Sequence, residues 1–366
     1  HTELGDYLVV DDTGAFDKCS YGEEEVACES GPPGKMLCRR VNVYPNYQGD
    51  IVMQERQRDE RPEEESSFFN ILSCCVRNSR AQRVFSKVKT FRDFVLSWSL
   101  LWQCIAEFIG TMLIVIIGCG SVGAAVLTRA QTGIWQVAII WFLGVSLSIY
   151  ATATISGAHL NPAVSFAFAL FRRKEFPLHK LLFYSIAQYL GAMLGASLLL
   201  GLFNTQINDV LELNDTSRGS GSETSIMTAS IFCEYFPNPG FASIIRVSVF
   251  QALSIEAFGT GILMFMILSL TDNRSKAVRN KDFAPLFIGA TVAVLISIFA
   301  PFTQAGWNPA RDFGPRLVAC FAGWWGDAIP APHNGFWIYI VGPYLGAFVG
   351  AFFYDTTISL GLQATT

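Results

Sequence analysis

The sequence has little charge for its length. Of its 366 residues, only 15% are Asp, Glu, Lys or Arg, whereas 51% are hydrophobic. Its mean hydropathy is positive, at +0.36. This composition argues against an ordinary soluble globular protein. The net charge of -4 shows no basic excess, so nothing in it points to nucleic acid as a partner.

The sequence also lacks the clusters that mark metal and catalytic sites. Its nine cysteines are an odd number, spread over the polar N-terminal part and the apolar blocks without metal-ligand spacing. No motif combines a nucleophile, a base and an orienting group. We therefore expect no metal, no cofactor and no enzymatic activity.

What the sequence does contain is a set of long apolar runs. A helix needs about 20 apolar residues to cross a hydrocarbon core of roughly 30 Å. Six blocks meet this requirement: residues 98–118, 133–155, 181–203, 247–270, 283–302 and 336–360. The sequence therefore predicts an all-α membrane protein with six transmembrane helices.

The distribution of Lys and Arg predicts the orientation of these helices. Basic residues gather before the first block, between the second and third, and between the fourth and fifth. The positive-inside rule places these connections and both termini in the cytoplasm of a multi-pass plasma-membrane protein. The sequon at Asn214 lies in the third connection, which this topology makes extracellular, so Asn214 is a predicted glycosylation site.

Composition divides the chain into parts. The first part is an acidic, polar tail without a sustained apolar period, which we expect to be disordered and cytoplasmic. The predicted parts are the tail 1–66, a basic juxtamembrane segment 67–97, a first repeat 98–204, an extracellular connection 205–246 and a second repeat 247–360.

The two repeats share three motifs in the same order. Because each half holds an odd number of spans, the second half would be inserted upside down relative to the first. Inverted repeats place a functional site at their interface near the bilayer midplane. The repeated motifs are Glu107-x-x-Gly110-Thr111 with Glu256-x-x-Gly259-Thr260, Asn161-Pro162-Ala163 with Asn308-Pro309-Ala310, and Tyr189-Leu190-Gly191-Ala192 with Tyr344-Leu345-Gly346-Ala347.

Each Asn-Pro-Ala motif predicts a half-helix that is too short to span a membrane, at residues 161–171 and 308–319. Proline suits the first helical turn and asparagine suits the N-cap. Inverted symmetry brings the two N-termini together at the centre, where their positive dipole ends would oppose cations and hydronium. The amides of Asn161 and Asn308 would donate hydrogen bonds to a neutral solute in the lumen.

The loops before the half-helices would supply acceptors. Irregular backbone at this depth is tolerated where it lines a water-filled cavity, so its carbonyls can replace the solvation that a solute loses. The predicted carbonyl-lining residues are Gly157, Ala158, His159 and Leu160 in the first loop and Thr303 and Gln304 in the second.

Among the charged residues within the membrane region, three have a predicted role. Arg311 directly follows the second motif, where it would repel cations and donate to hydroxyl groups. Glu107 and Glu256 occupy equivalent places in the two repeats, which favours a role as acceptors that anchor the loops. A direct role of these two carboxylates in the pore is the alternative.

These motifs resemble those of a known family. Residues 156–164 (SGAHLNPAV), together with 308–316 (NPARDFGPR), are similar to the paired signature of the aquaporin, or major intrinsic protein, family and to its glycerol facilitator branch. The resemblance covers about residues 100–355. It implies the aquaporin fold, and a homotetramer in the lipid bilayer with one pore in each subunit. It also implies passive transport of water, glycerol or related small neutral solutes, with protons and ions excluded.

The resemblance also implies a selectivity filter. Counting from the motifs, the filter positions of the family correspond to Trp141, Ile296, Ala305 and Arg311. An aromatic face can pack the carbon side of a polyol while an arginine bonds its hydroxyls. Asp312 and Arg316 match an acidic and a basic residue that are typical of the glycerol-conducting branch.

Some positions depart from this branch. The bacterial facilitator has Gly and Phe where this chain has Ile296 and Ala305, and Tyr339-Ile340 stands where a Pro and an aliphatic residue are usual. The absence of His at position 296 argues against a strictly water-selective filter. A water-dominant channel with little polyol permeation remains an alternative. A secondary transporter is another, since transporters also use inverted repeats.

Overall fold

The computed structural model describes five strands between residues 7 and 55, and the chain over residues 91–276 and 278–365, with side chains from residue 98 onward. The chain divides into two compact units, His1–Val88 and Lys89–Thr366, which are described separately.

The first unit contains an antiparallel sheet. Its strands run in the order β1-β4-β3-β2, with β5 also paired to β4. The strands differ from the expectation of a tail without regular structure. One reason is that β4 places Val41 and Val43 at alternate positions, the period that favours a strand. The strands are β1 (Tyr7–Leu8), β2 (Cys19–Tyr21), β3 (Glu24–Ser30), β4 (Met36–Pro45) and β5 (Ile51–Glu55). The rest of the tail, and most of the segment 67–97, lie outside the described residues.

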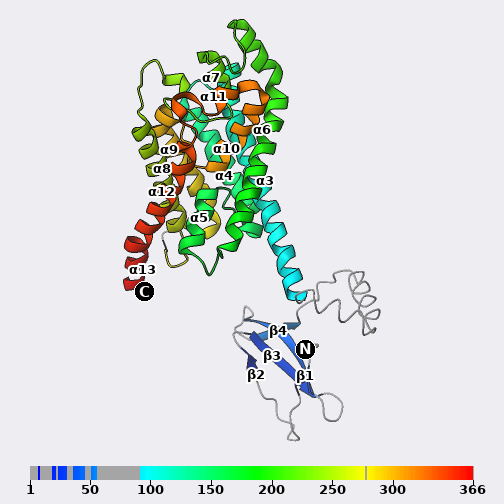
Figure 1. Cartoon of the computed structure of the whole chain (residues 1–366). Helices are drawn as coiled ribbons and strands as arrows, with labels where there is room; N and C mark the ends of the chain where they lie inside the picture. The colour runs from blue at the N-terminus through cyan, green and yellow to red at the C-terminus, as the bar shows by residue number, and fades with distance from the viewer. Residues whose placement is uncertain are drawn as a thin grey trace, which may run out of the picture. The chain divides into compact units, whose positions relative to one another are not determined.

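The second unit is helical. Within the described residues, six helical segments are long and apolar enough to cross a membrane, which confirms the predicted all-α fold. The long helices of these segments are α3 (Phe91–Thr128), α4 (Ile134–Ser156), α6 (His179–Leu213), α8 (Val249–Thr271), α9 (Ala284–Thr303) and α12 (Ile338–Tyr354). Two shorter helices, α5 (Pro162–Phe171) and α10 (Pro309–Ala319), lie among the long ones (Figure 1).

The remaining elements are short. On the side of the helical unit away from the C-terminus lie α7 (Glu223–Ala229) and α11 (Trp325–Ala328) (Figure 1). At the other end, α12 continues through a π-helical turn, η5 (Asp355–Ser359), into α13 (Leu360–Thr365). Single turns are η1 (Pro239–Phe241), η2 (Lys281–Phe283), η3 (Cys320–Trp324) and η4 (Pro332–Asn334).

The third long helix, α6, continues beyond its predicted end, to Leu213. The guanidinium of Arg218 donates hydrogen bonds to Asn204 Oδ1 at 2.6 Å and to Asn208 Oδ1 at 2.8 Å. These bonds fold the following loop back along the last turns of α6. The end of the helix is therefore held by these side-chain hydrogen bonds and by burial of Ile207 and Leu211, which are 0% and 4% exposed.

The packing of the helices repeats between the two halves. In the first half α3 packs against α4 and α6, and in the second half α8 packs against α9 and α12. The half-helices are exchanged: α5 packs against α12, and α10 packs against α6. This exchange is what an inverted repeat requires when each half contributes one re-entrant helix to a shared centre.

Glycine allows the paired helices to approach closely. A Cβ atom at Gly191 on α6 would overlap the carbonyl oxygen of Phe108 on α3, and one at Gly346 on α12 would overlap that of Ala257 on α8. Small residues at such crossings permit backbone contact between membrane helices. The two glycines occupy equivalent positions, so the first and third long helices of each repeat approach each other in the same way.

The outer surface of the helical unit is apolar. Leu190 and Leu202 on α6 and Val349 and Phe353 on α12 are 52%, 73%, 59% and 57% exposed. An exposed apolar surface of this extent is unsuited to water but suited to hydrocarbon. The unit is accordingly that of a multi-pass membrane protein.

Candidate pore

The two half-helices begin in the same way. Asn161 is the N-cap of α5, and its side-chain oxygen accepts a hydrogen bond from the N–H of Ala163 at 2.9 Å. Asn308 is the N-cap of α10, and its oxygen accepts from the N–H groups of Ala310 at 3.0 Å and Arg311 at 3.2 Å. Each motif therefore starts a helix, and Pro162 and Pro309 occupy the first turn, where the missing N–H removes no bond.

The two motifs are bonded to each other. The amide nitrogen of Asn161 donates to the carbonyl of Trp307 at 2.9 Å, and that of Asn308 donates to the carbonyl of Leu160 at 2.8 Å. Each carbonyl immediately precedes the opposite motif. The N-termini of α5 and α10 therefore meet at one point, and each amide keeps a second N–H that can face the solute.

Two buried carboxylates hold the loops before the half-helices. Glu107 on α3 accepts hydrogen bonds from the N–H groups of His159 at 3.0 Å and Leu160 at 2.7 Å. Glu256 on α8 accepts from the N–H groups of Gly306 at 3.1 Å and Trp307 at 2.8 Å. Since both glutamates are 0% exposed, these N–H groups would otherwise be unpaired in the protein interior.

Both loops contain residues in the left-handed backbone region. In the first loop Ala158 and Leu160 have φ of 49° and 50°, and in the second loop Ala305 and Trp307 have φ of 66° and 40°. Residues other than glycine rarely adopt this region, and such strain is found mainly where function requires a particular backbone shape. The glutamate anchors therefore hold both loops in a shape that they would not adopt alone.

A cavity of about 250 Å³ runs along these loops. All four predicted filter residues line it: Trp141, Ile296, Ala305 and Arg311. Asn161, Asn308 and the whole first loop, Gly157, Ala158, His159 and Leu160, line it as well.

Thr303 and Gln304, which were predicted to line the lumen, lie outside this cavity lining. Helix α9 continues to Thr303, and Gln304 is its left-handed C-cap, so the extended part of the second loop starts one residue later. Ala305, Gly306 and Trp307 take the lining positions. The half-helix register was correct, but the end of α9 could not be read from its apolar run.

Arg311 and Trp141 form one wall of the cavity. The guanidinium carbon lies 4.8 Å from the centroid of the indole ring. Trp141 is 8% exposed and Arg311 3%. The indole fits because Gly118 on α3 faces it, where any Cβ atom would overlap the ring. The wall therefore presents an apolar face beside a set of hydrogen-bond donors.

The sequence analysis did not single out Glu234, which forms an ion pair with Arg311. Glu234 is 1% exposed, in the connection between α7 and η1. Arg311 also donates to the carbonyl of Phe232 at 3.4 Å. A possible signal was that Glu234 is a lone acid in the aromatic run 232–236. The charge of Arg311 is therefore compensated inside the protein.

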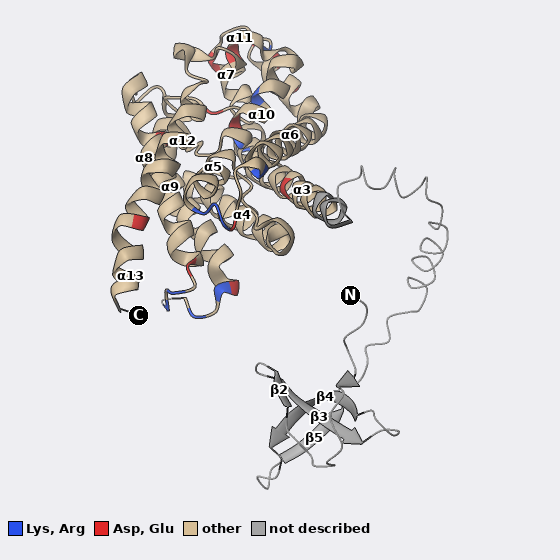
Figure 2. Cartoon of the chain, turned by 60° about the horizontal axis from the view of Figure 1, so that its bottom comes forward, with Lys and Arg blue, Asp and Glu red and all other residues tan. Residues whose placement is uncertain are grey.

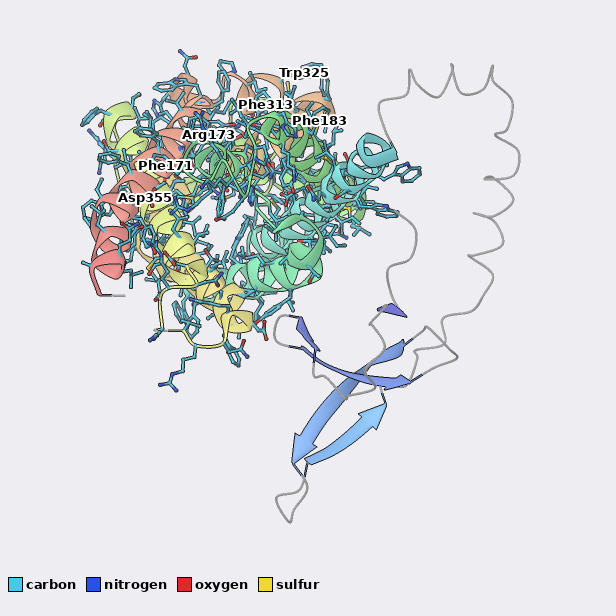
Figure 3. The ribbon with its side chains drawn as sticks, turned by 90° about the horizontal axis from the view of Figure 1, so that it is seen from below. Phe171, Arg173, Phe183, Phe313, Trp325 and Asp355 are labelled. Carbon is cyan, nitrogen blue, oxygen red and sulfur yellow. The ribbon has the colours of Figure 1, made fainter. Side chains whose placement is uncertain are left out.

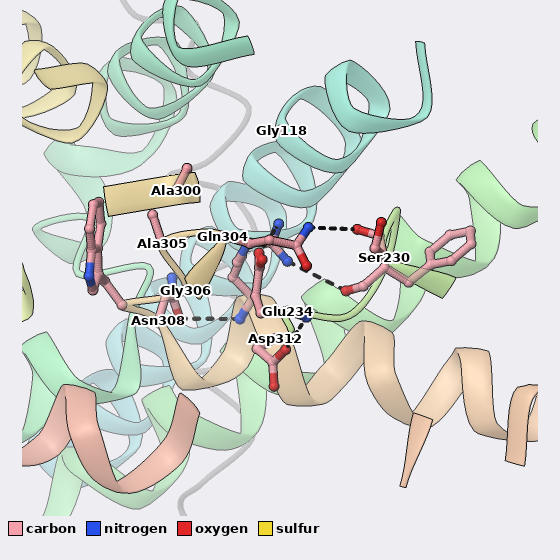
Figure 4. Close-up of polar contacts among 12 residues, drawn as sticks. Gly118, Ser230, Glu234, Ala300, Gln304, Ala305, Gly306, Asn308 and Asp312 are labelled. Carbon is pink, nitrogen blue, oxygen red and sulfur yellow. Dashed lines mark hydrogen bonds and ion pairs between the residues drawn. The ribbon is translucent and has the colours of Figure 1, made fainter. Parts of the chain in front are cut away.

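Asp312 and Arg316 lie behind the cavity wall and form hydrogen bonds with the backbone of Glu234. Asp312 Oδ1 accepts from the N–H of Glu234 at 2.8 Å, and Arg316 donates to the carbonyl of Glu234 at 2.6 Å. The two side chains also pair with each other at 2.7 Å, and both are 0% exposed. Gln304 holds the next residue by accepting from the N–H of Tyr235 at 2.9 Å. Figure 4 shows Asp312 beside Glu234.

On the C-terminal side, charged residues lie on the loops (Figure 2). Arg172, which caps α5, pairs with Asp355 at the end of α12 at 2.7 Å; Figure 3 shows Asp355 on the same side as Phe171 and Arg173. Beyond α8, Arg274 pairs with Asp272 at 2.6 Å. Hydrogen bonds from Arg274 hold the pKa of Asp272 well below its usual range.

Two further expectations concern the glycosylation site and metal binding. Asn214 is the C-cap of α6 and is exposed. In the part of the chain that the structure describes, no group of three or more His, Cys, Asp or Glu side chains could hold a metal ion.

Comparison with known proteins agrees with this geometry. The sequence profile of the family described as "Major intrinsic protein" matches residues 95–354. The propanediol uptake facilitator of Citrobacter freundii is 42% identical over 270 residues, which cover 73% of this chain and 96% of that protein. The glycerol uptake facilitator protein of Pseudomonas aeruginosa is 41% identical over 268 residues, covering 73% and 92%. The X-ray structure of the aquaglyceroporin from Plasmodium falciparum is similar with a TM-score of 0.61 and 27% identity, covering 72% of this chain and 99% of that one. This chain belongs to the major intrinsic protein family.

Proposed function

We propose that this chain is a passive channel for glycerol, propanediol and related small neutral solutes, together with water. The observation that carries the proposal is the wall made by Arg311 and Trp141 in a buried cavity. A short polyol has a carbon side and a hydroxyl side. The indole can pack against the first while the guanidinium donates to the second.

Solute passage along this cavity requires no reaction. Carbonyls of the first loop can accept from hydroxyl groups, and the amides of Asn161 and Asn308 can donate to them. These groups replace the water that the solute sheds on entry. Two helix N-termini meeting at the Asn residues supply partial positive charge, which opposes cations and hydronium but not neutral molecules.

The relatives support the same solute class. Those compared above are described as facilitators of glycerol or propanediol uptake. Both molecules are short carbon chains that carry hydroxyl groups. A slot with one apolar wall and one donor wall suits both, since neither needs a charged partner.

Swelling of proteoliposomes tests the proposal. Vesicles with the full chain are mixed in a stopped-flow instrument with isosmotic glycerol or propanediol, and uptake is followed by light scattering. We expect both solutes to enter several-fold faster than into vesicles without protein, without saturation or dependence on a proton or sodium gradient. Glycerol entry at the rate of empty vesicles would refute a polyol channel, and entry driven by an ion gradient would favour a transporter.

A water-dominant channel is the second candidate, because Ile296 lines the cavity. This branched side chain is 5% exposed and occupies the wall beside Ala305. The same vesicles in an osmotic gradient of an impermeant sugar report water flux alone. Rapid water flux without glycerol flux would select this candidate.

The individual roles follow from the contacts. We propose that Trp141, Ile296, Ala305 and Arg311 set the narrowest section, and that Asn161 and Asn308 orient solutes at the centre. The anchoring contacts of Glu107 and Glu256 favour support of the loops over a direct role in the pore. Asp312 and Arg316 would act through Glu234 rather than on the solute.

We further propose a homotetramer in the plasma membrane with both termini cytoplasmic and Asn214 glycosylated outside. The topology rests on the Lys and Arg of the connections, and Asn214 has the exposure that modification needs. Cross-linking in native membranes would report four subunits. Loss of a mass shift in Asn214→Gln would report the glycan, and protease protection of an N-terminal tag would report the orientation.

A further inference from the structure

One charged side chain lines the cavity far from the Arg311 wall. Lys281 begins the turn η2 that leads into α9, and it is part of the cavity lining. Along α9 the lining then includes Ala284, Ile288 and Ile296. At about 1.5 Å per residue, position 281 lies roughly 20 Å from position 296 along the helix direction. Lys281 therefore stands at the C-terminal-side mouth of the cavity, which the proposed topology makes cytoplasmic.

The ammonium group of Lys281 is held by neutral groups. Its Nζ atom donates to the carbonyl oxygen of Leu270 at 3.1 Å and to that of Ser275 at 3.2 Å. An ammonium has three N–H donors, so one remains for the mouth. The Leu270 carbonyl belongs to the last turn of α8, where a cation also complements the helix dipole. These two hydrogen bonds hold the ammonium group of Lys281 in place.

Lys281 differs from the arginines near the two ends of the cavity, because each of those arginines is paired with a carboxylate. At one end, Arg311 is paired with Glu234 and Arg316 with Asp312. At the other end, Arg172 and Arg274 also have carboxylate partners. Among the described residues, no carboxylate forms an ion pair with Lys281. Asp282, the next residue, has an exposed side chain.

We infer that Lys281 is a second charge filter and a specificity-determining residue at the cytoplasmic mouth, where it excludes inorganic cations from the cavity. The inference rests on the proposed channel function. A unit charge acting at about 5 Å changes the local concentration of a monovalent cation by roughly four-fold in water, and by more than a hundred-fold at an effective dielectric of about 20. A narrow mouth with apolar walls lies between these limits. Because Arg311 is compensated, Lys281 supplies uncompensated charge to the route that a cation would follow.

The test compares charge changes inside and outside the mouth. Full-length Lys281→Glu, Lys281→Gln and Lys281→Arg are reconstituted beside Lys276→Glu and Arg279→Glu, which make the same charge change at exposed positions of the same loop. Sodium and potassium permeability is measured as bilayer conductance, and glycerol flux is measured by swelling of the same preparations. The ratio of the two is the readout, since a merely structural defect would lower glycerol flux without admitting cations.

We expect Lys281→Glu to raise the ratio of cation to glycerol permeability by about tenfold or more, and Lys281→Gln to raise it less. Lys281→Arg and the two control variants should keep the parent ratio. The increase should shrink at high salt, because screening reduces the field at the mouth. An unchanged ratio in Lys281→Gln, which retains side-chain donors and is the variant most able to fold, would overturn the inference. Absence of glycerol flux in the parent chain would instead overturn the proposed function. In that case the ratio of cation permeability to water permeability would replace the glycerol ratio and would still decide the inference about Lys281.

Discussion

The two re-entrant loops, residues 157–160 and 304–307, are built on one plan but have different surroundings. Each follows a long helix, is anchored by a buried glutamate and leads into an Asn-capped half-helix. Each also provides the carbonyl that the opposite asparagine binds. These shared features concern the backbone. They place the same acceptors and donors at the centre from both sides.

The side chains behind the loops are not equivalent. His159 of the first loop stacks on Phe168 with ring centroids 4.5 Å apart and contacts Ser165 Oγ at 3.1 Å. The second loop is instead tied to the connection before η1, through Gln304 and through the pair of Arg311 with Glu234. The symmetric residues hold the backbone of both loops. We propose that the asymmetric ones influence the charge and width of the cavity.

The largest effect is expected from breaking what the loops share. Glu256→Ala removes the acceptor for two buried N–H groups, each costing about 1–3 kcal/mol when left unpaired. Glu107→Ala should cause a similar loss in the other loop. We expect little folded protein from either, and glycerol flux per reconstituted chain reduced at least several-fold. Yield, size-exclusion profile and swelling rate measure this. Parent-like flux in one variant alone would show that the two anchors are not equivalent.

The next effect concerns the asymmetric charge pair. Glu234→Ala leaves Arg311 buried without its carboxylate partner, a change that typically costs about 3–5 kcal/mol. We expect a lower unfolding temperature in detergent, and a shift in the ratio of water to glycerol flux as Arg311 moves. Glu212→Ala, at an exposed position near the end of α6, is the matched control. Shifts of the same size in the control would show that the effect does not come from loss of the Glu234–Arg311 ion pair.

A smaller effect is expected from widening one wall. Ile296→Ala removes buried carbon atoms from the cavity lining and should raise glycerol flux relative to water flux several-fold. It should also cost about 2–4 kcal/mol of stability. Ile298→Ala makes the same change on the exposed face of α9 and should alter neither ratio nor stability by a comparable amount. An unchanged ratio in Ile296→Ala would mean that the narrowest section lies elsewhere along the loops.

The smallest effect lies outside both loops, at Asp272. Since Arg274 lowers the pKa of Asp272 in the folded chain, the pair stabilises the fold above the unfolded pKa of about 3.9, and this contribution is lost as the pH falls below that value. Water screens the pair, so its contribution to stability should be small. Asp272→Asn should lower the unfolding temperature slightly at pH 7, and the difference from the parent should shrink toward pH 3. Asp282→Asn, which makes the same change at an exposed position, is the matched control.

Much of the fold could be predicted from sequence because the membrane imposes it. Apolar length decides which segments span, and proline after a capping asparagine decides where α5 and α10 begin. The repeated Glu, Asn and Gly positions predicted an inverted pair of halves. These are local or periodic signals, which a single chain displays without its neighbours. The filter positions were implied by the resemblance to a known family.

Other features depended on contacts between distant residues. The pairing of Glu234 with Arg311, the grip of Asp312 and Arg316 on the backbone of Glu234, and the place of Lys281 at the mouth have no local pattern. Gln304 was assigned to the lumen with the rest of the loop before the second motif. In the structure α9 continues past Pro301 to Thr303, and the side chain of Gln304 accepts a hydrogen bond from the N–H of Tyr235. The sequence by itself therefore determined the spans, the half-helices and the family of the channel. Only the tertiary structure decided which charges are compensated, because a charge in a low-dielectric interior acts through its nearest partners in space and not along the chain.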